Sequence, residues 1–137
     1  MTKKKALAEH LEVKPNEISQ SSYDENTFEL GNQEYLVLTD DEADQRTKEY
    51  IADSVWAFNS DFIIEHSSAL DYDEASKKVI MAIAEQCESG NEAMKKLIDN
   101  FDEFAEDAIS ADGRGHFLSS YDGAEWKNGD YYIYRTN

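Results

Sequence analysis

Cysteine, basic residues and long apolar runs are all scarce in this 137-residue chain. The single cysteine, Cys87, cannot form an intramolecular disulfide, and its apolar neighbours predict a small core residue in a reducing compartment. No window approaches the roughly 18 apolar residues of a membrane span, and the basic start MTKKK is not followed by the apolar stretch of a signal peptide. We therefore expect a cytoplasmic protein that neither enters nor crosses a membrane.

The shortage of basic residues leaves the chain strongly acidic. Thirteen Lys and Arg face thirty Asp and Glu, which gives a formal net charge of -17. Such a charge repels nucleic-acid phosphates and anionic lipid and favours basic protein partners. Hydrophobic residues make up 40% of the chain and aromatic residues 12%, enough for a folded core in one domain spanning residues 1–137.

Motifs for catalysis, cofactors and metals are also missing. Residues 41–44 spell the helicase box DEAD, but no phosphate-binding GxxxxGK[ST] loop is present, so these residues are interpreted as a helix start. The acidic clusters lack the ligand offsets of an EF-hand, and His10, His66 and His116 lie far apart without paired cysteines. There is no GxSxG elbow around Ser119 and Ser120. We expect no enzyme activity, no cofactor and no metal site.

The clearest pattern in the chain is a helix over residues 39–66. Thr39 or Asp40 can cap its first turn, with Glu42 completing a capping box. Apolar side chains then recur at spacings of three and four, which predicts a helix with one buried face. That stripe comprises Ala43, Thr47, Tyr50, Ile51, Val55, Phe58 and Phe62.

Two further helices are predicted between residues 71 and 112. Asp71 is the expected N-cap of the first, and Gly90 marks its end. Its core line is expected to be Val79, Ile80, Ile83 and Cys87. The second begins near Asn91 and stops at Asp112-Gly113, with Met94, Leu97, Ile98, Phe101, Phe104, Ala108 and Ile109 facing inward.

The two ends of the chain predict a sheet. Gly31-Asn32 separates two strand-like runs within residues 26–38, and Asn128-Gly129 does the same in the tail. These hairpins can join in one small antiparallel sheet with the three amphipathic helices packed on one face, which is an α+β fold. The expected organisation is an N-terminal helix and linker (1–22), a hairpin (26–38), acidic helices (39–111) and a C-terminal β-hairpin region (113–137).

The N-terminal segment also raises a helix-turn-helix hypothesis. Residues 2–12 predict a short helix, and LAEHLEVKPNEI is similar to the opening of such a DNA-binding motif. A basic recognition helix should follow, but residues 19–25 are polar and acidic. We interpret the first helix as a packing element and expect no direct binding to nucleic acid.

Two blocks, LVLTDDEADQRTKEYI (36–51) and DGRGHFLSSYDGAEWKNGDYYIYRTN (112–137), resemble small acidic proteins common in bacteriophage and prophage genomes. In those proteins a strand leads into a T-D-x-E-A helix, and a GRGH-x-LS-x-YDG-x-E block leads to a closing YYIYR strand. The resemblance covers about a third of the chain and implies a phage-associated protein in a bacterial host cell. It also implies a shared role for Gly113, Arg114, Gly115, His116, Ser119, Tyr121, Asp122 and Gly123.

The charge concentrates in the middle of the chain. Residues 39–112 hold twenty acids and six bases, or -14 of the total of -17. Our leading hypothesis is a non-enzymatic inhibitor that binds a basic, nucleic-acid-binding bacterial protein as a DNA mimic, for example an anti-CRISPR or anti-restriction protein. Its candidate contacts are Asp40, Asp41, Asp44, Asp53, Asp61, Asp102, Glu103, Glu106 and Asp107.

Two alternatives stay open. The glycines around Arg114 and His116 permit unusual backbone angles, so this loop, with Tyr121 and Trp126 nearby, is a candidate site for a small molecule or nucleotide. The acidity can also serve solubility alone in an accessory phage protein. The sequence leaves the oligomeric state open between monomer and homodimer.

Overall fold

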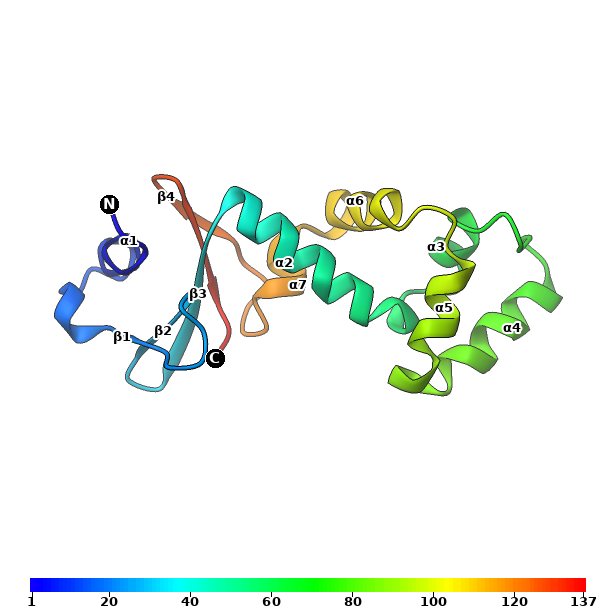
Figure 1. Cartoon of the computed structure of the whole chain (residues 1–137), viewed down its shortest axis with the longest axis horizontal. Coiled ribbons are helices and arrows are strands. Elements are labelled where there is room, and N and C mark those ends of the chain that lie inside the picture. Colours follow the sequence, from blue (N-terminus) through cyan, green and yellow to red (C-terminus); the bar gives the residue numbers. More distant parts are fainter. The chain divides into compact units, whose positions relative to one another are not determined.

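The computed structural model describes all residues 1–137, which divide into two compact units (Figure 1). Unit 1 comprises Met1–Thr47 and Asp112–Asn137, and unit 2 comprises Lys48–Ala111. In the sequence, unit 2 is thus inserted between the two parts of unit 1. The predicted α+β class is confirmed, because seven α-helices accompany one five-stranded antiparallel sheet.

The first hairpin has the predicted turn. Strands β2 (Thr27–Leu30) and β3 (Gln33–Thr39) pair with Leu30 opposite Gln33, which leaves Gly31-Asn32 as a two-residue connection. Gly31 has φ +60°, and Asn32 has a negative φ. A positive φ at the first turn residue alone defines a type II′ turn, whose twist matches that of the flanking strands.

The second hairpin has its turn one residue later than predicted. Strands β4 (Trp126–Asn128) and β5 (Tyr131–Arg135) pair with Asn128 opposite Tyr131, so the connection is Gly129-Asp130 and not Asn128-Gly129. Gly129 has φ +63°. The glycine takes the first turn position because that position requires the positive φ.

The two hairpins join in one sheet through the pairing of β3 with β5, as predicted. With the two-residue strand β1 (Ser19–Gln20) at one edge, the strand order is β1-β2-β3-β5-β4. Strands β3 and β5 are therefore neighbours in the sheet although they lie far apart in the sequence. Their pairing places the strand that leads into α2 (Asp40–Asp53) directly beside the tail.

Helices cover both faces of this sheet, and the prediction of helices on one face is wrong. Figure 1 shows α1 (Lys3–Leu11) on one side of the strands and α7 (Arg114–Leu118) on the other. The α1 side buries Leu7, Ala8, Ile18, Phe28, Tyr35, Val37 and Ile133. The opposite side buries Leu36, Leu38, Ala43, Leu118 and Tyr134. Successive residues of β3 and β5 point to opposite faces and are apolar on both, so each face needs a cover.

The start of α2 is fixed as the sequence predicts. The Thr39 backbone N–H donates to Glu42 Oε1 at 2.9 Å, and the Glu42 N–H donates to Thr39 Oγ1 at 3.2 Å, which completes the capping box. Lys3 Nζ also donates to Glu42 Oε1 at 2.7 Å. Glu42 therefore ties α1 to the start of α2 within unit 1.

The predicted long helix over residues 39–66 is divided into three pieces. After α2 ends at Asp53, a 3-10 turn, η2 (Val55–Ala57), precedes the short helix α3 (Ser60–Glu65). Asn91 holds this break, since its Nδ2 donates to the Ala52 carbonyl at 2.7 Å and its Oδ1 accepts from the Trp56 N–H at 3.2 Å. The residue expected to begin a later helix thus supplies hydrogen bonds to backbone groups on both sides of the break.

The region after Gly90 also forms more helices than predicted. The single helix expected there is interrupted at Ile98, whose extended backbone separates α5 (Asn91–Leu97) from α6 (Phe101–Asp112). Asn100 then caps α6 by accepting from the Glu103 N–H at 3.1 Å. None of the helices is both long and apolar enough to cross a lipid bilayer.

Helix α4 (Glu74–Ala84) departs most from its predicted packing. Its N-cap is Asp73, which accepts from the Ser76 N–H at 2.8 Å, and not the expected Asp71. Of the expected core line, Ile80 is buried but Val79 is 46% exposed. Cys87 is exposed as well, so the prediction that it is a core residue is wrong. It lies beyond the end of α4 with φ +53°, where the chain has already left the helix.

Acid should weaken the attachment of α1 to the start of α2. Burial alone raises the pKa of Glu42, but the hydrogen bonds from Lys3 and from the Thr39 N–H outweigh it, and the pKa lies below its ordinary value. A lowered carboxyl pKa contributes stability above the unfolded-state pKa, and this contribution is lost as the pH falls through the folded-state pKa. We expect Glu42→Gln to lower the melting temperature at pH 7, with a difference from the wild type that shrinks toward pH 3. A difference that stays constant over this range would contradict the assignment.

Candidate functional site

The loop nominated around Arg114 is the start of a helix. Gly113, with φ +82°, precedes the first turn of α7, and Gly115 is buried within it. A Cβ atom on Gly115 would lie 2.5 Å from the Gly123 carbonyl oxygen, so only glycine lets α7 approach the segment 123–125 this closely. The two glycines therefore position Arg114 at a point where two parts of the tail meet.

Arg114 lies at the centre of an ion-pair cluster within unit 1. Its side chain is only 10% exposed. Nη1 donates to Asp40 Oδ1 at 2.9 Å and to Asp44 Oδ1 at 3.0 Å, and Nε donates to Glu125 Oε2 at 2.9 Å. The guanidinium also lies over the Tyr132 ring, with Cζ 4.5 Å from the centroid. Three carboxylates and an aromatic face thus surround one cation.

The cluster joins two segments that are far apart in the sequence, residues 36–51 and 112–137. Asp40 and Asp44 are one turn apart on α2, so both face the same side of that helix. Glu125 comes from the tail, immediately before β4, and its carboxylate also accepts a hydrogen bond from the Tyr134 hydroxyl on β5. Sequence reasoning missed Glu125 and Tyr134, although both stand in the 112–137 block.

The electrostatics of the cluster favour the charged arginine. Burial by itself lowers the pKa of the Arg114 guanidinium, but its hydrogen bonds to Glu125 and Asp40 outweigh this and raise the pKa above its ordinary value. Burial, together with the bond to Glu125, raises the pKa of the Tyr134 hydroxyl well above its ordinary value. Arg114 is therefore a cation and Tyr134 a neutral donor, and neither is placed to transfer a proton near neutral pH.

A second set of tail contacts holds the end of α7 against β5. The Ser119 hydroxyl lies 2.7 Å from the Arg135 carbonyl and 2.8 Å from Asp122 Oδ1. The same Asp122 oxygen accepts from the Ala124 N–H at 3.0 Å. The hydrogen bonds from Ser119 and from the Ala124 N–H lower the Asp122 pKa. These polar residues of the GRGH-x-LS-x-YDG block make intramolecular contacts.

The structure does not gather the four nominated ligand residues into one site. Tyr121 lies under the Arg135 guanidinium, 3.6 Å from its Cζ to the ring centroid. Trp126 is next to His10, with ring centroids 5.5 Å apart, and His116 is exposed beside Phe117. Arg114 alone is enclosed by charged groups. Each of the four side chains thus has a different set of neighbours.

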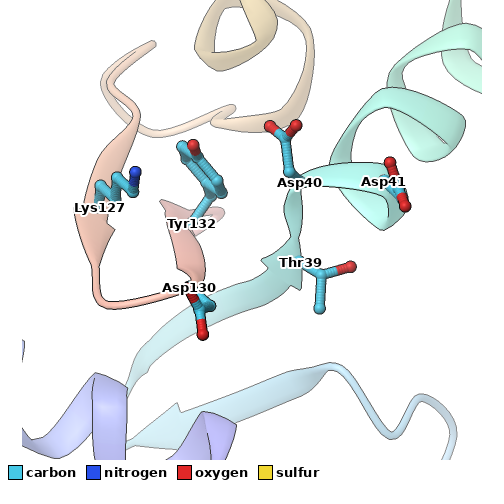
Figure 2. Close-up of a pocket in the computed structure, with 6 residues that line it drawn as sticks. All are labelled: Thr39, Asp40, Asp41, Lys127, Asp130 and Tyr132. Carbon is cyan, nitrogen blue, oxygen red and sulfur yellow. The ribbon is translucent and has the colours of Figure 1, made fainter.

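An open pocket of about 340 Å³ lies beside the ion-pair cluster (Figure 2). It is lined by Thr39, Asp40, Asp41, Lys127, Asp130 and Tyr132. Figure 2 shows Asp40 and Lys127 near Tyr132, whereas Asp41 and Asp130 extend away from that group. Asp40 is already bonded to Arg114, so the lining offers no convergent set of free ligand groups.

Unit 2 carries most of the uncompensated charge. It contains fifteen acids and five lysines, a net charge of -10, and every one of the fifteen acidic residues is exposed. Glu92, Glu106 and Asp107 each lie within 4 Å of a basic side chain. Like the other acids of unit 2, all three are exposed to solvent.

Helix α6 presents four of these acids along one side. Asp102, Glu103, Glu106 and Asp107 are all exposed, at positions one turn apart. The opposite side buries Phe104, Ala105 and Ala108. An aromatic cluster supports this side, because Phe104 contacts Phe58 and Phe62 with ring centroids 5.0 and 4.9 Å apart. The acids are therefore displayed on a helix anchored by a rigid core.

Two basic side chains border this row. Glu106 Oε1 lies 3.7 Å from Lys48 Nζ, and Asp107 Oδ2 lies 3.1 Å from His66 Nε2. Asp102 and Glu103 have no ion-pair partner. The nine nominated partner contacts therefore fall into two classes. Asp40 and Asp44 hold Arg114, whereas Asp41, Asp53, Asp61 and the four acids of α6 are exposed without that role.

Nothing in the chain is arranged as a metal site, since no group of three or more His, Cys, Asp or Glu side chains is placed to share an ion.

Comparison with known proteins adds no relative, because no protein-family model, curated protein or solved structure matches the chain. The function is therefore argued from these side chains alone.

Removal of the Arg114 cation should destabilise unit 1. Arg114→Gln would leave Asp40, Asp44 and Glu125 facing one another without a counter-ion, and we expect the free energy of unfolding to fall by about 3 kcal/mol. Arg114→Lys keeps the charge but not the forked geometry, so an intermediate loss is expected. Urea denaturation measures both, with the exposed Lys5→Gln as control. If Arg114→Gln is as stable as Lys5→Gln, the cluster does not hold the two blocks together.

Proposed function

We propose that this protein is a non-enzymatic inhibitor whose acidic helical unit covers the basic, nucleic-acid-binding surface of a bacterial protein. One observation carries the proposal. All fifteen acidic residues of unit 2 are exposed, and the unit has a net charge of -10. The partner's own ligand would be a nucleic acid, and the carboxylates of unit 2 would take the place of its phosphates. No chemistry on a substrate is required.

The arrangement of α6 supports this mode of binding. Asp102 and Glu103 are followed four residues later by Glu106 and Asp107, so the two pairs lie about 6 Å apart along the helix axis. Fixed charges of one sign steer a basic surface toward them and cost little conformational entropy on binding. Surface acids that serve only solubility need no such order.

The location of the charge supports different roles for the acids of the two units. In unit 1, Glu42 is paired with Lys3, Asp24 with Arg46, and Asp40 and Asp44 with Arg114. The two lysine pairs of unit 2, Lys48–Glu106 and Lys95–Glu92, are longer, at 3.7 and 3.8 Å. We therefore assign partner binding to unit 2 and narrow the nominated contacts to Asp53, Asp61, Asp102, Glu103, Glu106 and Asp107. The phage resemblance fits an inhibitor directed at a host defence or transcription component.

The proposal is tested by capture from a bacterial lysate at physiological salt. The tagged wild type should retain a basic nucleic-acid-binding protein that duplex DNA displaces. A variant with Asp102→Asn, Glu103→Gln, Glu106→Gln and Asp107→Asn should retain at least about tenfold less of it, because these side chains keep their shape and lose their charge.

A matched variant removes the same charge elsewhere. Glu12→Gln, Glu25→Gln, Glu29→Gln and Asp130→Asn are exposed positions in unit 1, and this variant should retain the partner as the wild type does. Equal loss in both variants would show a nonspecific effect of net charge. A wild type that retains only proteins released at physiological salt would contradict the proposal.

A further inference from the structure

Helix α4 exposes an apolar surface that the rest of unit 2 does not cover. Figure 1 shows α4 at the periphery of unit 2, beside α5. Six consecutive apolar residues run from Val79 to Ala84, yet only Ile80 among them is buried. Met81 is 59% exposed, and Ala82 is exposed beside it. Val79, Met81 and Ala82 thus form a small exposed apolar patch on α4, and such a patch is a candidate contact with another molecule.

Two opposite charges flank this surface on the same side of the helix. Lys78 and Glu85 are seven residues apart, which is close to two turns, so both point the same way and lie about 10 Å apart along the axis. Met81 and Ala82 lie between them. Both charged side chains are exposed, and neither forms an ion pair within the chain. Between Lys78 and Glu85 the order along this face is thus base, apolar centre, acid, and the exposed Glu74 lies one turn before Lys78.

That order is complementary to itself. When two such helices pack antiparallel about a twofold axis between Met81 and Ala82, Lys78 of one copy lies opposite Glu85 of the other, and the reverse contact forms at the same time. Each two-fold contact between identical surfaces requires this reciprocity. A parallel arrangement would instead oppose like charges.

The local charge also favours a second copy over the basic partner of the proposed function. Residues 74–85 carry two glutamates and two lysines, whereas the rest of unit 2 carries thirteen acids and three lysines. Two copies meeting through α4 therefore keep their most acidic surfaces out of the contact. A basic surface would meet Lys77 and Lys78 there and be repelled.

From these observations we propose that α4 is a self-association surface, through which two copies of the chain form an antiparallel helix pair with reciprocal Lys78–Glu85 contacts. The contact leaves the acids of α6 outside the interface. It is independent of the proposed function, because it uses none of the residues assigned to partner binding.

The test is sedimentation velocity of the whole chain at physiological salt over roughly 10 μM to 1 mM, the range of weak interfaces. The mass should rise with concentration from 15.6 kDa toward twice that value. Lys78→Glu and Glu85→Lys should each weaken association about tenfold, since each replaces two attractive pairs with two repulsive ones. The double variant Lys78→Glu/Glu85→Lys should recover it, because the reciprocal pairs form again with exchanged signs.

A control on α5 separates local pairing from net charge. Lys96→Glu makes the same charge change at an exposed residue without an ion pair, and it should associate as the wild type does. If the double variant regains association, misfolding does not explain the weaker association of the single variants. A wild type that stays monomeric at the highest concentration overturns the proposal, and so does a double variant that remains as weak as the singles.

Discussion

The guanidinium of Arg114 is a largely buried positive charge in a protein of net charge -17, and three carboxylates surround it. A buried cation without partners would carry a large desolvation cost, so α7 can pack against the sheet only when Asp40, Asp44 and Glu125 are in place. These carboxylates come from α2 and from the tail. The interaction therefore holds together two parts of the chain that are separated by the whole of unit 2.

This requirement orders the rest of unit 1. The pairing of β3 with β5 brings the start of α2 beside the tail, and the capping box at Thr39 and Glu42 fixes the direction in which α2 leaves the sheet. Gly115 lets α7 approach the segment 123–125 closely enough for the arginine to reach both sides. Each contact is weak in isolation, but together they specify one arrangement of strands and helices.

The acids consequently have two different roles. Where a carboxylate faces Arg114, Lys3 or Arg46, it belongs to the packing of unit 1. In unit 2 all the carboxylates are exposed, and the core around Phe104 is formed by aromatic side chains. Their charge is then available for binding, which is the physical basis for assigning the partner surface to α6.

Local signals determined much of this protein from the sequence alone. The capping box, the Gly31-Asn32 turn and the alternation in β3 and β5 each depend on neighbouring residues, so the sequence predicts the α+β class and the joining of the hairpins. The acidity of the middle of the chain is also a property of composition. The helical spacing of apolar residues, by contrast, led to wrong predictions of which side chains are buried. Apolar residues at helical spacing predict a buried face, but they do not say what buries it.

Only the tertiary structure decided how the charges and apolar faces are used. The periodicity of residues 39–66 continues across Ser54, yet the helix ends there because Asn91, distant in sequence, supplies hydrogen bonds to the broken turn. Asp40 and Asp102 are both aspartates in the first turn of a helix, but Asp40 pairs with Arg114 whereas Asp102 faces water. Val79 and Cys87 are likewise exposed because no distant part of the chain packs over them. Burial, pairing and exposure depend on contacts between residues far apart in the chain, and a linear pattern does not contain those contacts.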